Sequence, residues 1–133
     1  MIKWVDSFSV NVKEIDEQHK RLIGIINELK YSIINENQDD TIEKILDNLT
    51  NYTITHFKLE EDYFDKLNYP LAESHKKEHA YFIEKINDFK KEFKVKKVML
   101  SIDILNFLMN WLIKHINDSD KNYSDFFNKH GIT

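Results

Sequence analysis

The sequence predicts an all-α fold, an up-down-up-down antiparallel four-helix bundle with an N-terminal arm and a short C-terminal helix. The chain of 133 residues contains two glycines and one proline, so turns are few and elements are long. Apolar residues recur every three or four positions through four segments, which is the period of an amphipathic helix. Long helices joined by short turns favour alternating directions. The expected helices span residues 12–36, 41–66, 70–93 and 102–118, with a tail helix over 120–129.

We expect a single domain over residues 1–133 that opens with an arm over residues 1–11. Trp4 belongs to this arm, whose aromatic side chains are expected to cover one end of the bundle. Asn11 followed by Glu14 has the spacing of a capping box, so Asn11 is the expected N-cap of the first helix. An apolar stripe then runs along that helix from Ile15 to Ile33.

The other three helices have start signals and stripes of the same kind. Asp40 is the expected N-cap of the second helix, and Ser101 of the fourth. Pro70 suits the first turn of the third helix, where its missing N–H does no harm. After Asp120, aromatic residues at 123, 126 and 127 predict a short helix packed back on the bundle.

Composition excludes several classes of protein. The formal net charge is −4 with acids and bases interspersed, which gives no basic surface for nucleic acid. Cysteine is absent, which excludes disulfides, thiolate zinc sites and iron–sulfur clusters. No apolar run is long enough to span a membrane, and the start of the chain has no signal-peptide pattern. We therefore expect a cytoplasmic location, with no nucleic-acid or membrane partner.

Five of the six histidines lie on predicted inward faces, together with two carboxylates. Two pairs, His56/Glu60 and His75/His79, are four residues apart, so each pair shares one helix face. In an alternating bundle, the starts of the first and third helices and the ends of the second and fourth lie at one end. All the candidates fall at that level: His19, His56, Glu60, His75, His79, His115 and Asp120.

This much buried polarity needs a partner, because an unpaired buried polar group costs several kcal/mol. Imidazoles and carboxylates suit iron, zinc, copper or manganese. One ion takes at most about six ligands, so seven protein groups predict two ions. Five histidines, two bridging carboxylates and a bridging oxide or hydroxide would fill all but one of the roughly twelve positions of two octahedral ions. The vacancy predicts a small exogenous ligand.

His115 and Asp120 are five residues apart, which on a regular α-helix places them about 140° apart around the axis. Both reach the site only if the fourth helix ends, loosens or takes a π-type turn near residues 117–119.

With these motifs, the sequence resembles the hemerythrin family in its bacterial single-domain form. The resemblance covers nearly the whole chain. The residues that carry it are Trp4, I-D-E-Q-H at 15–19, H-F-K-L-E at 56–60, H-K-K-E-H at 75–79 and W-L-I-K-H-I-N-D-S-D at 111–120.

The resemblance implies a non-heme di-iron centre with a bridging oxide or hydroxide. His75, His79 and His115 would hold one iron. His19 and His56 would hold the other, five-coordinate iron, and Glu60 and Asp120 would bridge the two. Family behaviour implies reversible binding of dioxygen at the open position, for storage, delivery or sensing, rather than catalysis.

The residues agree with binding rather than oxidation, because the Glu-x-x-His motifs of carboxylate-rich di-iron proteins are absent. A di-iron redox enzyme (oxidase, peroxidase or nitric oxide-handling protein) and an iron store remain alternatives, with nitric oxide as a further candidate ligand. Five residues are candidates for a dry wall around the ligand: Ile23, Phe57, Phe82, Leu112 and Ile116. Asp16 and Tyr123 are candidates for hydrogen bonds to imidazoles or to the arm. His130 is expected to be exposed and not a ligand.

Overall fold

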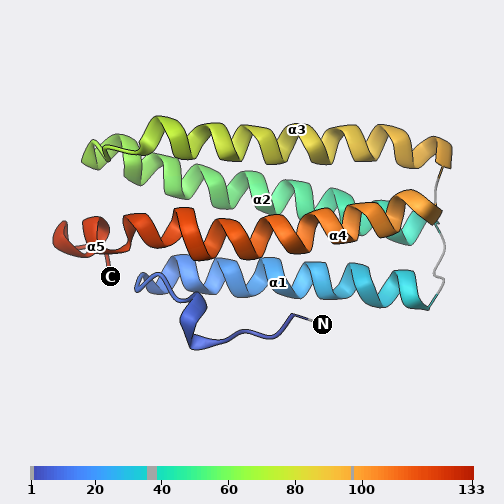
Figure 1. The fold of residues 1–133 in the computed structure, drawn as a ribbon, viewed down its shortest axis with the longest axis horizontal. Coiled ribbons are helices and arrows are strands. Elements are labelled where there is room, and N and C mark those ends of the chain that lie inside the picture. The colour runs from blue at the N-terminus through green and yellow to red at the C-terminus, as the bar shows by residue number, and fades with distance from the viewer. Residues whose placement is uncertain (1, 36–38, 97) are drawn as a thin grey trace.

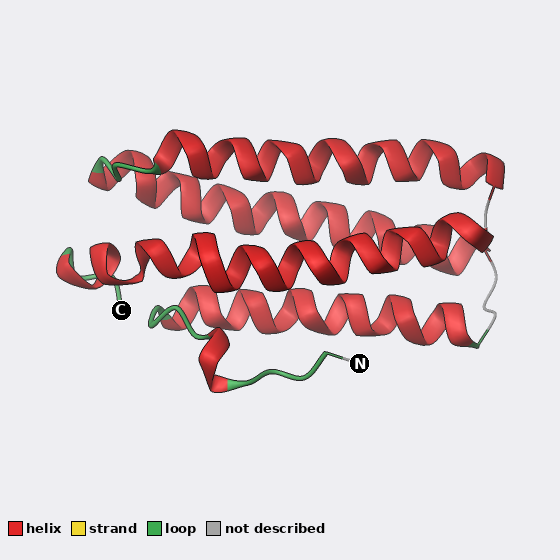
Figure 2. Cartoon of the chain, in the orientation of Figure 1, coloured by secondary structure: helices red, strands yellow, loops and turns green. Residues whose placement is uncertain are grey.

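The structure, a computed structural model, describes residues 2–35, 39–96 and 98–133. Four long helices lie side by side and alternate in direction (Figure 1). The described part of the chain contains helices and loops and no strand (Figure 2). The all-α four-helix bundle predicted from the sequence is confirmed. The helices are α1 (Lys13–Ile34), α2 (Asp39–Leu67), α3 (Ala72–Lys96), α4 (Val98–Lys114) and α5 (Lys121–Lys129).

The apolar stripes of the four long helices meet in the middle of the bundle. α1 packs against α2 and α4, and α3 packs against the same two helices. A second apolar cluster lies at the end of the bundle where α1 and α3 begin and α2 ends. There α5 continues beyond α4 and contributes Tyr123 and Phe127 to the cluster (Figure 1). Along the chain, His19 and His75 fall between residues of the two clusters, whereas His56 and His115 stand directly before Phe57 and Ile116 of the main cluster.

The arm runs along the side of the bundle rather than covering only its end (Figure 1). The side-chain amide of Asn27 pairs with both backbone groups of Ile2, at 3.0 Å and 2.8 Å, and this pairing ties the start of the arm to the middle of α1. Trp4 packs against the main core cluster, and a short 3-10 helix η1 (Asp6–Phe8) turns the chain back toward α1. The expectation that the arm caps one end was therefore wrong for Trp4.

The start of α1 is closed by Asp16, not by the predicted capping box. Asn11 adopts a left-handed conformation with φ 57°, and Val12 holds the N-cap position without a side-chain cap. The carboxylate of Asp16 instead accepts hydrogen bonds from the Ser9 hydroxyl at 2.5 Å and the Val10 N–H at 2.9 Å. Asp16 thus secures the arm, one of the two roles expected for it.

Three other predicted helix starts were misplaced. Asp40 lies inside α2, and Ser101 lies inside α4, because both helices begin earlier than expected. Pro70 stands two residues before α3, in the turn that follows Asn68, whose φ is 54°. The backbone N–H of Tyr69 donates to the Phe64 carbonyl at 3.0 Å, which closes the end of α2 without a side-chain cap.

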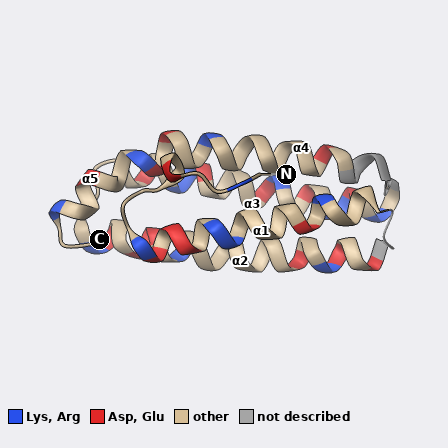
Figure 3. Cartoon of the chain, turned by 90° about the horizontal axis from the view of Figure 1, so that it is seen from below, with Lys and Arg blue, Asp and Glu red and all other residues tan. Residues whose placement is uncertain are grey.

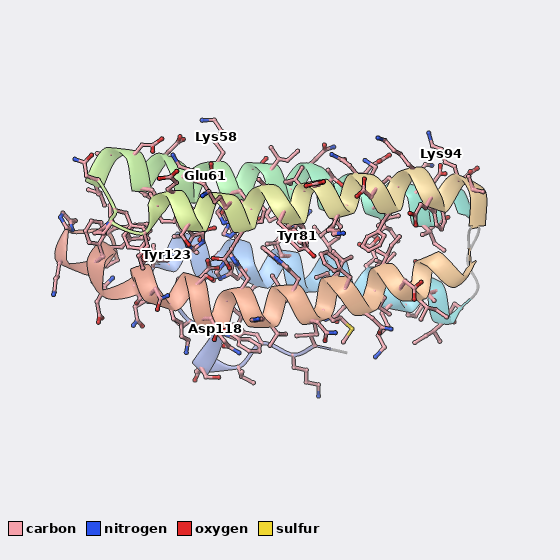
Figure 4. The ribbon with its side chains drawn as sticks, turned by 45° about the horizontal axis from the view of Figure 1, so that its top comes forward. Lys58, Glu61, Tyr81, Lys94, Asp118 and Tyr123 are labelled. Carbon is pink, nitrogen blue, oxygen red and sulfur yellow. The ribbon has the colours of Figure 1, made fainter. Side chains whose placement is uncertain are left out.

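Acidic and basic residues are interspersed along the helices (Figure 3). Lys58 and Lys94 point away from the bundle, whereas Tyr123 lies between helices near its end (Figure 4). Within the described residues, no helix has the length and apolar content needed to cross a membrane.

The main core gives a direct stability prediction. Leu108 is fully buried, so Leu108→Ala should lower the free energy of unfolding by about 2–5 kcal/mol, because it removes packed methyl groups and leaves a cavity. Leu71→Ala is the matched control, because Leu71 is 50% exposed. Denaturant unfolding followed by circular dichroism measures both, and equal effects of the two substitutions would contradict the assigned core.

Candidate metal centre

The structure brings all seven predicted ligand residues together. Each is at most 3% exposed. Asp120 lies at the centre of one half, where its Oδ1 is 2.9 Å from Nε2 of His75 and 2.9 Å from Nε2 of His115. Its Oδ2 is 3.0 Å from Nε2 of His19. Three helices, α1, α2 and α3, and the turn after α4 therefore bring their ligand side chains to one buried site.

Glu60 occupies the matching position on the other side. Its Oε1 is 3.2 Å from Nε2 of His56 and 3.3 Å from Nε2 of His79. The seven side chains form two groups, and within each group the ligand atoms lie within 4.8 Å of one another. Both groups include Glu60 and Asp120. One group adds His75, His79 and His115; the other adds His19 and His56. Two groups that share two carboxylates have the layout of a paired-ion site.

The last part of the fourth helix has the irregularity that the sequence required. Residues His115–Asp120 form a π-helical turn, η2, between α4 and α5. Hydrogen bonds in such a turn join residues five apart, so His115 and Asp120 face the same side. Both are buried at the centre. The predicted π-type turn is confirmed, and the sequence spacing of these two residues is the reason for it.

Two further polar side chains hold outer ring nitrogens by hydrogen bonds, and a third lies at ion-pair distance from one; no motif in the sequence pointed to them. Gln18 Oε1 lies 2.5 Å from Nδ1 of His56, and Glu61 Oε2 lies 2.8 Å from Nδ1 of His79. Glu78 Oε1 lies 3.5 Å from Nδ1 of His115. The Ser119 hydroxyl donates to both oxygens of Glu78, at 2.6 Å and 2.8 Å. Such partners fix the orientation of an imidazole so that its Nε2 faces the site.

The tautomers that these partners impose favour a cation in the centre. The Glu61 carboxylate only accepts hydrogen bonds, so Nδ1 of His79 must donate to it. In the neutral ring, Nε2 of His79 then carries a lone pair, and it lies 3.3 Å from a carboxylate oxygen of Glu60. Two lone pairs at this distance repel each other unless a positive charge lies between them.

Unpaired buried atoms support the same conclusion. Among the described residues, both carboxylate oxygens of Glu60, both of Asp120 and Nε2 of His79 are buried without a hydrogen-bond partner. Leaving so many polar atoms unpaired is unfavourable in a fold that has no partner for them. Imidazole and carboxylate ligands suit iron among other transition metals, so these residues fit a pair of metal ions.

The two central carboxyls are ionised. Burial alone would raise their pKa values, but the surrounding histidines outweigh burial. His56 holds the pKa of Glu60 below its usual range, and His115, His19 and His75 hold that of Asp120 well below it. Two anions at the centre attract cations.

The pKa values of His115 and His56 are shifted in opposite directions. Burial lowers the pKa of His56. Burial also acts to lower the pKa of His115, but the charges of Asp120 and Glu78 outweigh it and raise the value to about 10. In the absence of metal His115 is therefore protonated at neutral pH, and metal binding must displace that proton.

Two more expectations concern residues near the site. Tyr123 is completely buried, with its ring centroid 5.7 Å from that of His75. Its hydroxyl has no hydrogen-bond partner among the described residues, so the expected hydrogen bond to an imidazole or to the arm is not made. Burial, reinforced by Asp120 and Glu60, raises the pKa of Tyr123 well above its usual value, so its phenol stays neutral. His130 is exposed as predicted, and its Nδ1 lies 2.7 Å from the Phe126 carbonyl oxygen.

A small, mostly apolar cavity of about 10 Å³ borders the histidines of the smaller group. Of the predicted wall, Phe57, Phe82 and Leu112 line it, whereas Ile23 and Ile116 are buried in the surrounding core without lining it. On α1 the wall consists instead of Leu22 and Ile26, which are four residues apart and share a face. The complete lining is His19, Leu22, Ile26, Leu49, Thr53, His56, Phe57, Phe82, Trp111, Leu112 and His115.

Comparison with known proteins identifies the family. Residues 10–126 match the model of the hemerythrin HHE cation binding domain. The chain belongs to the hemerythrin family. The resemblance seen in the sequence is thus confirmed.

Individual relatives agree with this assignment over almost the whole chain. A bacteriohemerythrin from Clostridium acetobutylicum is 33% identical over 129 residues, covering 94% of this chain and 100% of that protein. A bacteriohemerythrin from Stenotrophomonas maltophilia is 28% identical over 130 residues, covering 98% of this chain and 84% of that protein. A crystal structure of wild-type hemerythrin is 31% identical with a TM-score of 0.86, covering 94% of this chain and 96% of that one.

For this hemerythrin chain, the pKa of His115 predicts how the stability of the iron-free form depends on pH. The folded-state value of about 10 lies above the unfolded value of about 6.5, so the stabilisation is fully present below pH 6.5 and is lost as pH rises toward 10. The free energy of unfolding of the iron-free protein should therefore fall between pH 6.5 and 9.5, as measured by urea unfolding. His115→Asn should flatten this dependence, and a rise in stability over the same interval would contradict the assigned ionisation.

A substitution at the shared carboxylate tests the paired site. Glu60→Ala removes a residue common to both groups of ligands, so the variant should bind no iron or hold a mononuclear site at most. Elemental analysis of purified protein measures this. His130→Ala is the control and should leave the iron content unchanged, because His130 is exposed and outside both groups. Full iron occupancy in the Glu60 variant would refute the shared position.

Proposed function

We propose that this hemerythrin chain holds two iron ions, joined by a bridging oxide or hydroxide, and binds dioxygen reversibly at one open coordination position. The observation that carries the proposal is the pair of overlapping ligand groups that share Glu60 and Asp120. Storage, delivery or sensing of oxygen is the role that follows from such binding.

The assignment of ligands follows the two groups. His75, His79 and His115 would hold one iron, His19 and His56 the other, and Glu60 and Asp120 would bridge them. The larger group offers five protein ligands, so a bridging oxygen completes about six positions. The smaller group offers four, so the same bridge leaves one position open.

The cavity supports this division, because it borders both histidines of the smaller group, His19 and His56, but only one of the three histidines of the larger group, His115. A small molecule in the cavity therefore lies next to the ion with the incomplete ligand set. A volume of about 10 Å³ corresponds to roughly one water-sized molecule, so this cavity has no space for an organic substrate. This limit favours binding of a small ligand such as dioxygen, or nitric oxide, over oxidation of a larger one.

When bound, a di-iron centre supplies redox-active metal and an open coordination position for a small ligand. The chain's own residues supply the rest. Gln18 and Glu61 orient the imidazoles of His56 and His79 through their outer nitrogens. Glu78 places a carboxylate 3.5 Å from Nδ1 of His115. Phe57 stacks on His79 with a centroid distance of 3.7 Å, and Trp111 stacks on His115 at 4.3 Å, which shields both rings from water. Exclusion of water and protons slows irreversible oxidation of the metal.

The optical spectrum distinguishes this proposal from the alternatives. The reduced protein should develop a visible charge-transfer band on exposure to air and lose it on degassing, over repeated cycles. Irreversible bleaching with release of peroxide would instead favour a di-iron redox enzyme. Loss of metal to a mild chelator would favour an iron store. Either result would overturn reversible oxygen binding as the main function.

A further inference from the structure

Thr53 is a buried polar residue that the ligand assignment does not use. It lies on α2 one turn before His56, is 1% exposed and lines the small cavity. Its hydroxyl oxygen has no hydrogen-bond partner in the described part of the chain. An unpaired buried hydroxyl is unfavourable, so its presence beside a cavity needs a reason.

Other threonines of the same helix show the ordinary solution. The Thr50 hydroxyl donates to the Leu46 carbonyl at 2.8 Å, and the Thr55 hydroxyl donates to the Asn51 carbonyl at 3.1 Å. Both use the carbonyl four residues earlier, a bond open to any threonine within a helix. Thr53 does not make this bond. Its hydroxyl is therefore free to donate to a molecule in the cavity.

The rest of the cavity wall offers little competition for that molecule. Apart from Thr53 and three histidines, the lining is aliphatic or aromatic, and its one other side-chain donor is the indole N–H of Trp111. In such surroundings a single hydroxyl is the strongest determinant of how a small ligand is oriented, because the low dielectric strengthens its hydrogen bond.

We propose that the Thr53 hydroxyl recognises the small ligand of the centre by donating a hydrogen bond to the end of the ligand that points into the cavity. The inference rests on the proposed function and names the specificity residue of that same site. The favoured class is small electron-rich ligands whose free end accepts a hydrogen bond, dioxygen and triatomic anions among them. Small apolar molecules without an acceptor are disfavoured.

Azide is the probe for the test, because it is a small anion that accepts hydrogen bonds at its free end. Thr53→Val replaces the hydroxyl with a methyl group of similar shape, and Thr50→Val is the matched control on the same helix. In the oxidised iron-loaded protein, Thr53→Val should weaken azide binding by roughly tenfold, the size of one hydrogen bond to a charged acceptor. Thr50→Val should bind azide like the wild type, and Thr53→Ser should restore the affinity.

A vibrational measurement separates a direct contact from an indirect effect. The stretching band of bound azide should shift between H2O and D2O in the wild type and in Thr53→Ser, but not in Thr53→Val. Wild-type affinity and an unchanged isotope shift in Thr53→Val would overturn the inference while leaving the proposed function intact. A wild-type protein that holds iron but binds neither azide nor dioxygen would overturn both.

Stability provides a readout that does not depend on a bound ligand. In full-length protein without azide, Thr53→Val should melt no lower than the wild type, because the hydroxyl it removes has no partner in the fold. Thr50→Val should melt lower, because its hydroxyl is bonded. An equal loss in both variants would show that the Thr53 hydroxyl is bonded within the fold, and this would overturn the inference.

Discussion

The structure depends on the contact between two buried carboxylates and the five imidazoles that surround them. Glu60 and Asp120 are completely buried, and every imidazole Nε2 around them lies within hydrogen-bonding distance of a carboxylate oxygen or another imidazole. Such a cluster is stable only with a positive charge that satisfies both kinds of ligand. Other features of the bundle hold these carboxylates and imidazoles at the same height along the bundle axis.

Three features of the fold position the side chains of the site. The π-helical turn η2 brings His115 and Asp120 to the same side of the last helix. Gln18, Glu61 and Glu78 lie on α1, α2 and α3, and each reaches the histidine of the next element around the bundle. The Ser124 hydroxyl donates to the Val10 carbonyl at 2.6 Å, so α5 is tied to the arm just before α1 begins. The arm, the last helix and the site are therefore mechanically connected.

Much of this arrangement was predictable because its signals are local. Four-residue spacing and apolar period placed Glu60 with His56, and His75 with His79, on inward faces. The five-residue spacing of His115 and Asp120 required an irregular turn, and the structure has one. Iron binding by these residues is a proposal, because helix geometry places the ligands but does not select iron over other transition metals.

The failures share a different cause, namely dependence on contacts between elements. Asn11 is a residue type favoured at an N-cap. In the structure, however, Asp16 binds the arm through the Val10 N–H, and Asn11 adopts a left-handed conformation. Gln18 and Glu78 stand beside ligand histidines in the sequence but serve histidines on other helices, so sequence proximity gave no signal for their partners. Ile23 was expected in the wall, but Leu22 and Ile26 are the residues of α1 that line the cavity.

The most direct test of the central claim is anomalous X-ray scattering at the iron absorption edge, measured on crystals of iron-loaded protein. Two separate peaks should appear, both adjacent to Glu60 and Asp120, with three histidines around one and two around the other. A single peak with all the histidines around it, or no peak between the two carboxylates, would contradict the account.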